Sequence, residues 1–429
     1  MLTMNFRLAV KRVNNATRSP VVVVGAGPAG ATAARALALA GVPVRLLDRS
    51  TFPRNKPCGG GISVRVLGRF PYLERELPRI VTHTLSRLHL EGPDGRSAVV
   101  RSDVPAALMI RRLEFDALLV SLAVDAGAEL VTGADIVRAS MADGPVLLVA
   151  RDGRRFEADT LIAADGVHSV IARRLGLNPG WPASSVALDM MEETPRTVLR
   201  DLDPATLWVA YGYGGPGYAY IFPKRDHVNV GIGYLLSHYR AAIGSSPYEL
   251  QRAFIDRLRA RGIIAGESVR GNFTPFLIPV GGPLRRPGRG RVLLAGDAGG
   301  FVNAFTAEGI YYAMVSGDLA ARSVVDNGSA RRAGHVAARY RRACRREIGR
   351  ELRDSVLIQR YLFSNPRRIK ELVDAAPRHE AITNLILDYA IGRREYRSVR
   401  RRLLAHAPHL AFSLIAEAAK SFARRQRRR

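Results

Sequence analysis

Several residue types are scarce in this chain of 429 residues, and each scarcity narrows the class of protein. Only two cysteines occur, Cys58 and Cys344, which excludes a disulfide-rich scaffold and favours a reducing, cytoplasmic compartment. Neither cysteine stands in a cluster with metal-ligand spacing, so we expect no metal. No run of 18 apolar residues is present, which argues against a membrane-spanning helix. Residues 1–19 lack the long apolar segment of a signal peptide, and we expect an N-terminal extension there.

Acidic residues and lysines are also few. The chain has 38 Asp and Glu against 65 Lys and Arg, of which only five are Lys, and its formal net charge is +27. The excess is concentrated at 393–402 and 424–429. Such a surface attracts nucleic acid, anionic lipid or acidic substrates, but no nucleic-acid-binding motif is recognisable, so we expect no nucleic acid. Residues 403–422 are amphipathic enough to lie on the inner face of an anionic membrane, and a solvated face with a disordered tail explains the charge equally well.

The segment Pro20–Gly30 is the part of the sequence from which the rest can be placed. Four consecutive valines predict a buried parallel strand, and the pattern Gly-x-Gly-x-x-Gly follows them. An alanine-rich helix to Gly41 and a strand over 42–47, ending in Asp48, come next. Such a unit binds a dinucleotide, because the glycines let the backbone approach a pyrophosphate and the acid can bind a ribose hydroxyl. The alternative is a glycine-rich turn in another kind of α/β protein.

Two later strands end in the same combination of glycine and acid. A strand over 156–163 leads to Asp165-Gly166, and a short strand over 291–295 leads to Gly296-Asp297 and then to a long apolar helix, roughly 306–327. Strands that end before helices direct backbone amides to one place near the strand carboxyl ends. Asp297 can accept hydrogen bonds from sugar-like hydroxyls there, and a helix cap is the plainer alternative.

The remaining segments predict a second lobe. A hairpin is expected over 83–100, and a β pattern rich in tyrosine and glycine runs from 185 to 234, which is typical of an antiparallel sheet. The chain is also longer than one hydrophobic core usually serves. The loop 52–61 carries Cys58 followed directly by three glycines, so a flat group could lie against its backbone. Cys58 either has a role beside such a group or packs as a small apolar residue.

Together these motifs resemble the flavin-dependent enzymes of the p-hydroxybenzoate hydroxylase fold. In that family the first glycine motif holds the FAD pyrophosphate, an acid placed like Asp48 holds the adenosine ribose, and an acid placed like Asp297 binds the ribityl chain. Arg112 matches a family arginine near the FAD phosphates. Asp165-Gly-x-x-Ser-x-x-x-Arg173 matches a signature tied to the integrity of the FAD domain and to pyridine nucleotide use.

Three further stretches resemble the geranylgeranyl reductase family. They are Lys-Pro-Cys-Gly-Gly-Gly at 56–61, the segment 301–313, and Pro-x-Tyr-x-Tyr-x-Phe-Pro at 216–223 with its following Gly-x-Gly. In relatives this last motif lines the cavity for a long isoprenoid chain. The resemblance covers about residues 20 to 390. The chain departs from the pattern at Tyr220, Ala304 and Ala307, where tryptophan, proline and glycine are common, and the first departure concerns the shape of the lipid site.

The resemblance implies a set of site residues. The expected FAD contacts are Gly25, Gly27, Pro28, Ala29, Gly30, Asp48, Arg49, Cys58, Gly59, Gly60, Arg112, Asp165, Gly166, Gly296, Asp297, Gly309 and Ile310. The expected substrate contacts are Tyr218, Tyr220, Phe222, Pro223, Gly231 and Gly233. Cys58 is the expected catalytic residue, beside the isoalloxazine as a gate or proton relay. Glu308 either helps to seat the flavin or caps a helix.

The predicted fold class is α/β, with an FAD-binding Rossmann-like domain, an inserted antiparallel-sheet substrate domain and a helical C-terminal region. The expected domain boundaries are 20–82, 104–180 and 285–330 for the FAD-binding domain, 83–103 and 181–284 for the β-rich substrate domain, and 331–429 for the helical basic region.

The implied activity is FAD-dependent reduction of C=C bonds in a geranylgeranyl or other polyprenyl chain, by hydride transfer from reduced flavin. The expected partner is an isoprenoid lipid substrate, and the expected oligomeric state is a monomer. No second Gly-x-Gly-x-x-Gly is present, so the electron donor is expected to be NAD(P)H that visits transiently, or a ferredoxin. An FAD monooxygenase or halogenase of the same fold is the alternative, although halogenase relatives carry Trp-x-Trp-x-Ile-Pro at the aromatic motif. A non-enzymatic prenyl-lipid carrier is a third class, disfavoured because the flavin motifs are kept.

Overall fold

The structure is a computed structural model that describes residues 17–141, 144–200, 203–326, 333–375, 380–390 and 393–406. The chain forms two compact units, each assembled from three segments. Unit 1 consists of Met1–Lys56, Arg112–Pro182 and Pro279–Arg353, and unit 2 consists of Pro57–Arg111, Ala183–Ile278 and Asp354–Arg429.

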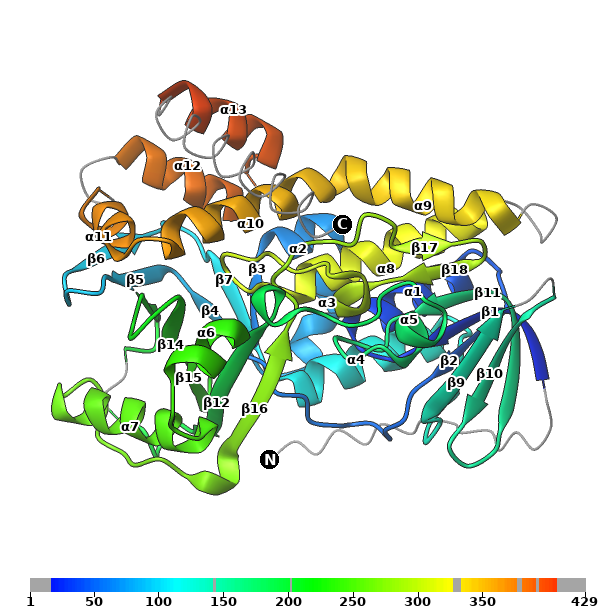
Figure 1. The fold of residues 1–429 in the computed structure, drawn as a ribbon, viewed down its shortest axis with the longest axis horizontal. Helices are drawn as coiled ribbons and strands as arrows, with labels where there is room; N and C mark the ends of the chain where they lie inside the picture. The colour runs from blue at the N-terminus through cyan, green and yellow to red at the C-terminus, as the bar shows by residue number, and fades with distance from the viewer. Residues whose placement is uncertain are drawn as a thin grey trace. The chain divides into compact units, whose positions relative to one another are not determined.

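Unit 1 is built on an eight-stranded sheet of order β17-β18-β11-β1-β2-β8, with β10 and β9 joined to β11 as an antiparallel extension. Five neighbouring strands, β18, β11, β1, β2 and β8, run parallel (Figure 1). The strands are β1 Thr17–Val24, β2 Val44–Leu47, β8 Glu129–Val131, β9 Ile136–Met141, β10 Val146–Ala150, β11 Arg155–Ala163, β17 Gly288–Arg289 and β18 Val292–Leu294. Their carboxyl ends therefore meet at one edge of the sheet.

The helices of unit 1 connect these strands. They are α1 Pro28–Leu39, α4 Arg112–Asp125, α5 Val170–Arg174, the short η4 Gly296–Gly299, α8 Ile310–Val325 and α9 Ala333–Glu347. Pro28 starts α1 with a φ angle already suited to a helix. Helices α1 and α8 pack backbone to backbone, because a Cβ atom on Gly317 would lie 2.1 Å from the carbonyl oxygen of Ala29. Only glycine fits at this crossing.

Unit 2 contains a seven-stranded sheet of order β16-β12-β15-β14-β13-β5-β6 and a three-stranded sheet of order β3-β7-β4. In the larger sheet all neighbours are antiparallel except β13 and β5, which run parallel. Its strands are β5 Arg87–Glu91, β6 Ser97–Arg101, β12 Ala187–Pro195, β13 Thr206–Tyr211, β14 Gly217–Pro223, β15 His227–Leu235 and β16 Phe273–Ile278. The smaller sheet has β3 Gly61–Ser63, β4 Thr82–Leu85 and β7 Ala107–Ile110.

Two helices, α6 Leu236–Ala242 and α7 Pro247–Ala260, cover one face of the larger sheet (Figure 1). Helix α7 begins at a capping box in which Ser246 and Glu249 bond each other's backbone amides. A buried apolar cluster that includes Met190, Trp208 and Ile221 fills the space under these helices. The other helical elements are α2 Arg65–Arg69, α3 Tyr72–Glu76, η1 Leu77–Arg79, η2 Ala183–Ser185, η3 Arg270–Asn272, α10 Gly349–Phe363, α11 Pro366–Ala375, α12 Glu380–Ala390 and α13 Tyr396–His406.

The α/β fold class and the main elements agree with the sequence predictions. The hairpin expected over 83–100 is formed by β5 and β6, whereas residues 83–85 belong to β4 of the smaller sheet. The helix expected from about 306 begins later, at Ile310. The units divide the chain differently from the expected domain boundaries, because all of Pro57–Arg111 belongs to unit 2. Most of the amphipathic segment 403–422, and the whole basic stretch 424–429, lie outside the described residues.

In the part of the chain that the structure describes, no helix is long and apolar enough to cross a membrane. The His, Cys, Asp and Glu side chains of the described residues form no group of three that could hold a metal ion.

Candidate cofactor and substrate sites

The three glycine-acid motifs and Asp48 lie side by side in unit 1. They follow β18, β11, β1 and β2, which are consecutive neighbours in the sheet. Four backbone hydrogen bonds continue the strand pairing past the strand ends: Ala295 N to Ala163 O at 2.8 Å, Ala164 N to Val24 O at 2.7 Å, Gly25 N to Leu47 O at 2.7 Å, and Asp48 N to Val131 O at 3.0 Å. Motifs far apart in sequence are thus brought together at the carboxyl edge, where open α/β sheets bind their ligands.

The three glycines of the first motif have different surroundings. Gly25 has a φ of +95°, and a Cβ atom there would lie 2.3 Å from the carbonyl oxygen of Ala164. A Cβ atom on Gly30 would lie 1.8 Å from the carbonyl oxygen of Gly25, so both positions are closed by the protein's own backbone. At Gly27 the nearest atoms are the guanidinium ends of Arg54 and Arg112, at 3.7 and 3.8 Å. Gly27 therefore faces a space bounded by two cations rather than by backbone.

These two arginines share one buried acid. Arg112 donates to both carboxylate oxygens of Asp116, at 2.6 and 2.7 Å, and Arg54 lies 3.1 Å from the same carboxylate. Asp116 is fully buried, so one negative charge holds two positive ones in place. The first turn of α1 contains no acid, and its N-cap Gly27 has no side-chain cap. Two guanidinium groups beside a helix N-terminus without a side-chain cap suit a diphosphate.

Arg54 is absent from the set predicted from the sequence. It follows the loop dipeptide Phe52-Pro53 and carries no local signal that separates it from the chain's many other arginines. Its placement depends on Asp116, 62 positions later in the chain, which only the fold brings near.

Asp48 braces the glycine loop. One carboxylate oxygen accepts from the backbone N–H of Ala26 at 2.7 Å, and the other accepts from Ser50 N–H at 2.8 Å. The side chain is 6 % exposed, and Arg49 beside it is exposed. A carboxylate oxygen can accept more than one hydrogen bond, so Asp48 retains acceptor capacity for a ribose hydroxyl at this edge.

Asp165 has an oxygen with no partner. Its Oδ2 accepts from the backbone N–H of Ile171 at 3.2 Å, whereas its buried Oδ1 has no hydrogen-bond partner among the described residues. Burial raises the pKa of this carboxyl, against the opposing hydrogen bonds of Ser169 and the α5 backbone. Gly166 follows with a φ of +81°, and Ser169 caps α5 by accepting from Ala172 N–H. A buried orphan acceptor is the feature expected where a ligand donor belongs.

Asp297 lies at the start of α8. A Cβ atom on Gly309, the N-cap residue, would lie 3.7 Å from Asp297 Oδ1, and Ile310 is the first helical residue. Gly296 adopts a φ of +59°, and its N–H donates to Ser316 of α8 at 2.9 Å. Ala307 has a φ of +54°, a conformation that favours glycine, which is the residue the resembling family has there.

These residues of unit 1 fit FAD. A cationic cradle lies over Gly27, an acid stands at the end of β2, an unsatisfied acceptor follows β11, and a second acid meets the N-terminus of α8. The donors and acceptors thus match a diphosphate and two polyol segments in chemical type.

The predicted substrate residues lie on two neighbouring strands, β14 and β15, of the large sheet of unit 2. Side chains alternate along its strands, so Tyr218, Tyr220 and Phe222 of β14 point away from the face that α6 and α7 cover. Pro223 alternates to the opposite face. Ring centroids follow one another from Tyr211 to Tyr218 at 5.7 Å, to Tyr220 at 6.0 Å and to Phe222 at 4.4 Å. We call these four rings the aromatic row, and Phe363 continues it, 6.4 Å from Tyr211.

The loop with Cys58 lies against the aromatic row. Asn229 of β15 donates to the carbonyl oxygen of Cys58 at 3.2 Å. A Cβ atom on Gly59 would lie 2.8 Å from the Phe222 ring. Gly60, with a φ of +77°, has room for no side chain because Ile110 O would lie 2.1 Å away. The structure therefore places Cys58, Gly59 and Gly60 with the predicted substrate residues, in unit 2.

Glycines on β15 make room for this row. A Cβ atom on Gly231 would lie 2.3 Å from Cζ of Tyr220, so the phenol ring occupies the space of the missing side chain. At Gly233 the nearest atom would be Oδ1 of Asp189, at 3.5 Å. Asp189 belongs to β12 and was not predicted as a site residue; its signal in the sequence is a carboxyl inside the apolar run Leu-Asp-Met-Met.

Charged groups occupy the other end of this face. Lys224, 2 % exposed, bonds Glu193 at 2.6 Å, and Arg111 donates to the same carboxylate at 3.0 Å. Burial lowers the pKa of Lys224, and the nearby Glu193 opposes that shift. This cluster lies beside Gly60, whose Cβ position would be 3.0 Å from Lys224 Nζ.

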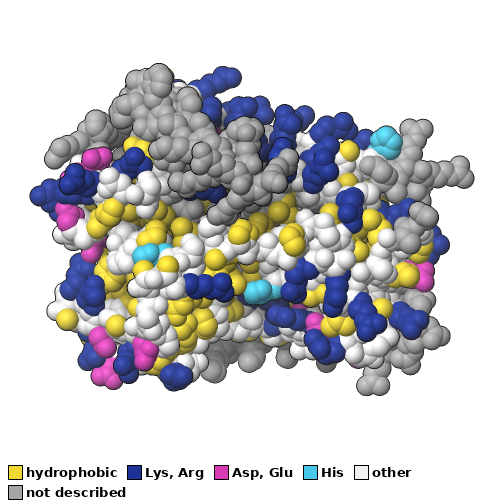
Figure 2. Space-filling view, in the orientation of Figure 1, with side chains coloured by type: hydrophobic (Ala, Val, Ile, Leu, Met, Phe, Trp, Pro, Cys, Tyr) yellow, Lys and Arg dark blue, Asp and Glu magenta, His cyan; other side chains and the backbone are white. Residues whose placement is uncertain are grey.

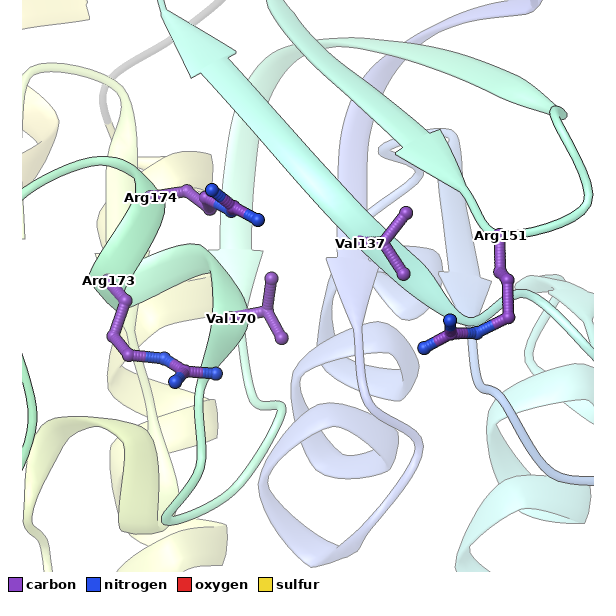
Figure 3. A pocket seen from close by; sticks show the side chains of 5 residues that line it. All are labelled: Val137, Arg151, Val170, Arg173 and Arg174. Atoms are coloured by element: carbon purple, nitrogen blue, oxygen red, sulfur yellow. The ribbon is translucent and has the colours of Figure 1, made fainter.

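Unit 1 also has an open cleft that the predicted site residues do not line. Its volume is about 560 Å³, and its lining includes Val137, Arg151, Val170, Arg173 and Arg174. In Figure 3, Arg173 and Arg174 extend from α5, and Arg151, which directly follows β10, lies across the cleft from them. Arg151 is paired with Asp135 at 2.8 Å. The lining is cationic, and it includes the arginine of the Asp-Gly-x-x-Ser-x-x-x-Arg signature.

Comparison with known proteins agrees with this geometry. Residues 18–321 match the family described as FAD binding domain. Digeranylgeranylglycerophospholipid reductase 1 of Methanothermobacter thermautotrophicus is 32% identical over 81% of this chain and 87% of its own. Menaquinone reductase of Mycolicibacterium smegmatis is 32% identical over 73% of this chain and 78% of its own. A geranylgeranyl bacteriochlorophyll reductase-like structure from Thermoplasma acidophilum covers 94% of this chain and 100% of its own with a TM-score of 0.78 at 20% identity.

The dinucleotide-binding sheet and the residues that fit FAD define a flavoprotein oxidoreductase. The chain belongs to the FAD-binding domain family and, within it, to the geranylgeranyl reductase family of FAD-dependent oxidoreductases. The FAD cofactor and the family predicted from the sequence are thereby confirmed. The individual site residues stay predictions.

Proposed function

We propose that the protein saturates C=C bonds of a geranylgeranyl or other polyprenyl chain with FAD as its cofactor. The observation that carries this proposal is the aromatic row, which lines one face of unit 2 beside the glycine-rich Cys58 loop. The names of relatives, digeranylgeranylglycerophospholipid reductase and geranylgeranyl diphosphate reductase, support a substrate with an isoprenoid tail.

The residues of unit 2 bind and orient the hydrocarbon in this proposal. Aromatic walls exclude water from an alkene, and each buried CH₂ group contributes about 0.8 kcal/mol. A twenty-carbon chain then binds tightly enough to be held in one position. Such positioning of the substrate against the cofactor is a main contribution of the protein to a cofactor-dependent reaction. When bound and reduced, FAD supplies the hydride. Unit 1 would hold it through the cradle over Gly27, through Asp48, and through Asp165 and Asp297.

The test is turnover without oxygen. The purified holoenzyme, its flavin reduced chemically so that no natural donor is needed, is given a geranylgeranyl-bearing lipid, and the product is analysed by mass spectrometry. A gain of two hydrogens per double bond is the expected result. A product that forms only in air and gains an oxygen atom would instead assign the protein to the hydroxylases of this fold, and an unchanged lipid under both conditions would contradict either enzyme.

A second experiment identifies the head group of the lipid substrate. Polyprenyl lipids extracted from cells with and without this gene should differ in the saturation of one lipid class. That class identifies the substrate among phospholipids, diphosphates, quinones and chlorophylls. Equal saturation of all classes would contradict a role in saturating cellular polyprenyl lipids.

We also propose a cytoplasmic location with peripheral contact at an anionic membrane. Lys and Arg side chains far outnumber Asp and Glu on the face shown in Figure 2, and each cation near an anionic surface contributes about 1 kcal/mol. In a flotation assay with anionic liposomes, the full chain should float, and a chain truncated after Arg400 should not. Equal flotation of the two would remove the C-terminal segment from this role.

A further inference from the structure

Apart from Glu193 in the charged cluster, the face that carries the aromatic row holds a second carboxyl group, that of Asp189. Asp189 and Met191 of β12 point to the same face of the sheet as Tyr218, Tyr220 and Phe222 of β14. The side chain is only 5 % exposed. A buried acid among rings and glycines costs stability unless it has a specific partner, so its presence on a face that binds hydrocarbon calls for a chemical role.

The partner of Asp189 is the phenol of Tyr220. The two oxygens of the carboxyl lie 3.1 and 3.4 Å from the Tyr220 hydroxyl. Tyr220 is 2 % exposed, and its ring fills the space left by Gly231. The hydroxyl exists only because tyrosine stands where the resembling family commonly has tryptophan. This chain therefore has an acid-phenol pair on the proposed lipid face.

The surroundings keep the carboxyl protonated. Burial raises the pKa of Asp189 to about 8, although the hydrogen bonds from Tyr220 and from the backbone of Met190 oppose the shift. The ionisable groups that interact with it are Tyr220 and Tyr218 from β14. The facing positions of β15 are Asn229, Gly231 and Gly233, and the position of β16 paired with Asp189 is Phe276, none of which is ionisable. The charged cluster of Glu193, Lys224 and Arg111 begins four residues along β12, about 13 Å away along the strand.

Saturation of a C=C bond needs a proton as well as a hydride. We propose that the Tyr220 hydroxyl donates this proton to the substrate. Asp189 is the positioning residue that reprotonates the Tyr220 oxygen. The inference rests on the proposed function. The alkene π bond breaks, one carbon takes the hydride that the reduced cofactor supplies, and the other takes the phenol proton. In the same step Tyr220 takes the carboxyl proton of Asp189, which afterwards regains one from water, so that atoms and electrons balance.

The protonation state of Asp189 decides where the phenol hydrogen points. A protonated carboxyl can donate to the Tyr220 oxygen, which leaves the phenol hydrogen free for the substrate. An ionised carboxylate only accepts, so it captures that hydrogen. Burial also raises the pKa of Tyr220 well above its ordinary value, so a phenolate does not persist and takes the proton of Asp189 in the same step. The rate of saturation should therefore fall as the pH rises through about 8.

Three variants of the full-length holoenzyme test this assignment. Tyr220→Phe removes the proton donor and should lower the rate of saturation about 100-fold, the smaller end of what a general acid contributes, with FAD content unchanged. Asp189→Asn should lower the rate less and should abolish its fall above pH 8. Tyr234→Phe is the matched control, because its hydroxyl donates to Tyr213 O under the opposite face of the same sheet, and it should retain the wild-type rate and pH profile.

The position of deuterium in the product is a second measure of which group donates the proton. In deuterated water the wild type should place deuterium on one face of a single carbon per saturated bond, because a fixed hydroxyl delivers it. Tyr220→Phe should lose that facial selectivity in whatever product it still forms. Retained selectivity together with a wild-type rate would overturn the proposal while leaving the reductase function intact. A wild type that forms no saturated product would remove both.

The state of Asp189 can be measured without turnover. A carboxyl whose pKa is raised on folding stabilises the fold fully below its unfolded pKa and loses that contribution as the pH rises toward the folded value. Between pH 3.8 and about 8, the unfolding equilibrium constant of the wild type should rise by up to tenfold per pH unit relative to Asp189→Asn. Parallel pH dependence of the two proteins in denaturant titrations would show that Asp189 is ionised and would overturn its role as the proton source.

Discussion

Two glycines three residues apart illustrate how differently single positions contribute. Gly30 is required by the protein's own packing, because any Cβ atom would collide with the backbone of Gly25 at 1.8 Å. Gly27 has only the flexible ends of two arginines nearby, at 3.7 and 3.8 Å. The sequence motif contains both, and only the structure shows that one serves the fold and the other faces the proposed diphosphate.

Alanine at these positions should therefore separate folding from binding. Gly27→Ala should fold normally but raise the FAD dissociation constant at least about tenfold, or 1.4 kcal/mol, because a methyl group enters the diphosphate space. Gly30→Ala should lower the free energy of unfolding by about 1–3 kcal/mol through overpacking. Flavin-fluorescence titration and denaturant unfolding measure the two effects. Gly68→Ala, at a helical glycine with no atom within 4 Å, is the control, and equal effects of Gly27→Ala and Gly30→Ala would contradict the distinction.

Residues with long-range partners could not be predicted. Arg54 gains its place from Asp116, and Asp189 gains its role from Tyr220, 31 positions later on a strand that is not its neighbour in the sheet. A sequence pattern reports residue type and local period, so it identified the glycine motif and the tyrosines but not the partners that set their chemistry.

At the scale of elements, the loop before β3 and the strand β14 form one structural feature. Asn229 holds the Cys58 carbonyl at 3.2 Å, and Gly59 lets the loop approach the Phe222 ring. The proposed role of Cys58, a gate or relay next to the cofactor, depends on this attachment. The loop is attached to the sheet through the Cys58 carbonyl and the Gly59 backbone, whereas the Cys58 thiol accepts from the N–H of Gly60 at 3.4 Å within the loop.

Replacement of Cys58 by alanine should accordingly lower turnover while leaving FAD binding and the loop in place. The backbone carbonyl that Asn229 binds is unaffected by the change. Turnover of polyprenyl substrate and flavin content per chain should be measured together. Unchanged turnover would remove the catalytic role of Cys58, and loss of flavin with turnover would show that the thiol serves binding instead.

The elements themselves were predictable where the pattern is local. Strands β1 and β11 and the hairpin of β5 and β6 appear where apolar runs and turn residues predict them. The parallel pairing of β13 with β5 was not predicted, since its register joins Thr206 to Arg87 across more than a hundred residues. The left-handed backbone at Ala307 likewise has no signal in an alanine, although the family's usual glycine would have indicated it.

At the scale of the whole molecule, each unit has a chemistry of its own. Unit 1 contributes the residues that fit FAD, and unit 2 contributes the aromatic row, the Cys58 loop and the acid-phenol pair. The sequence predicted two lobes with an inserted sheet, because the glycine-acid motifs flank a long β-rich stretch. It could not predict that Pro57–Arg111 belongs with that stretch, since membership in a unit depends on contacts between distant segments.

The most direct test of the proposed function is a single-turnover measurement in which flavin and lipid are followed in one sample. Holoenzyme with reduced FAD is mixed with a geranylgeranyl-bearing lipid in the absence of oxygen. Flavin absorbance is recorded, and the mass of the lipid is then determined by mass spectrometry. We expect one flavin to become oxidised for each double bond that gains two hydrogens. Flavin that stays reduced in the presence of bound, unchanged lipid would contradict the proposed function.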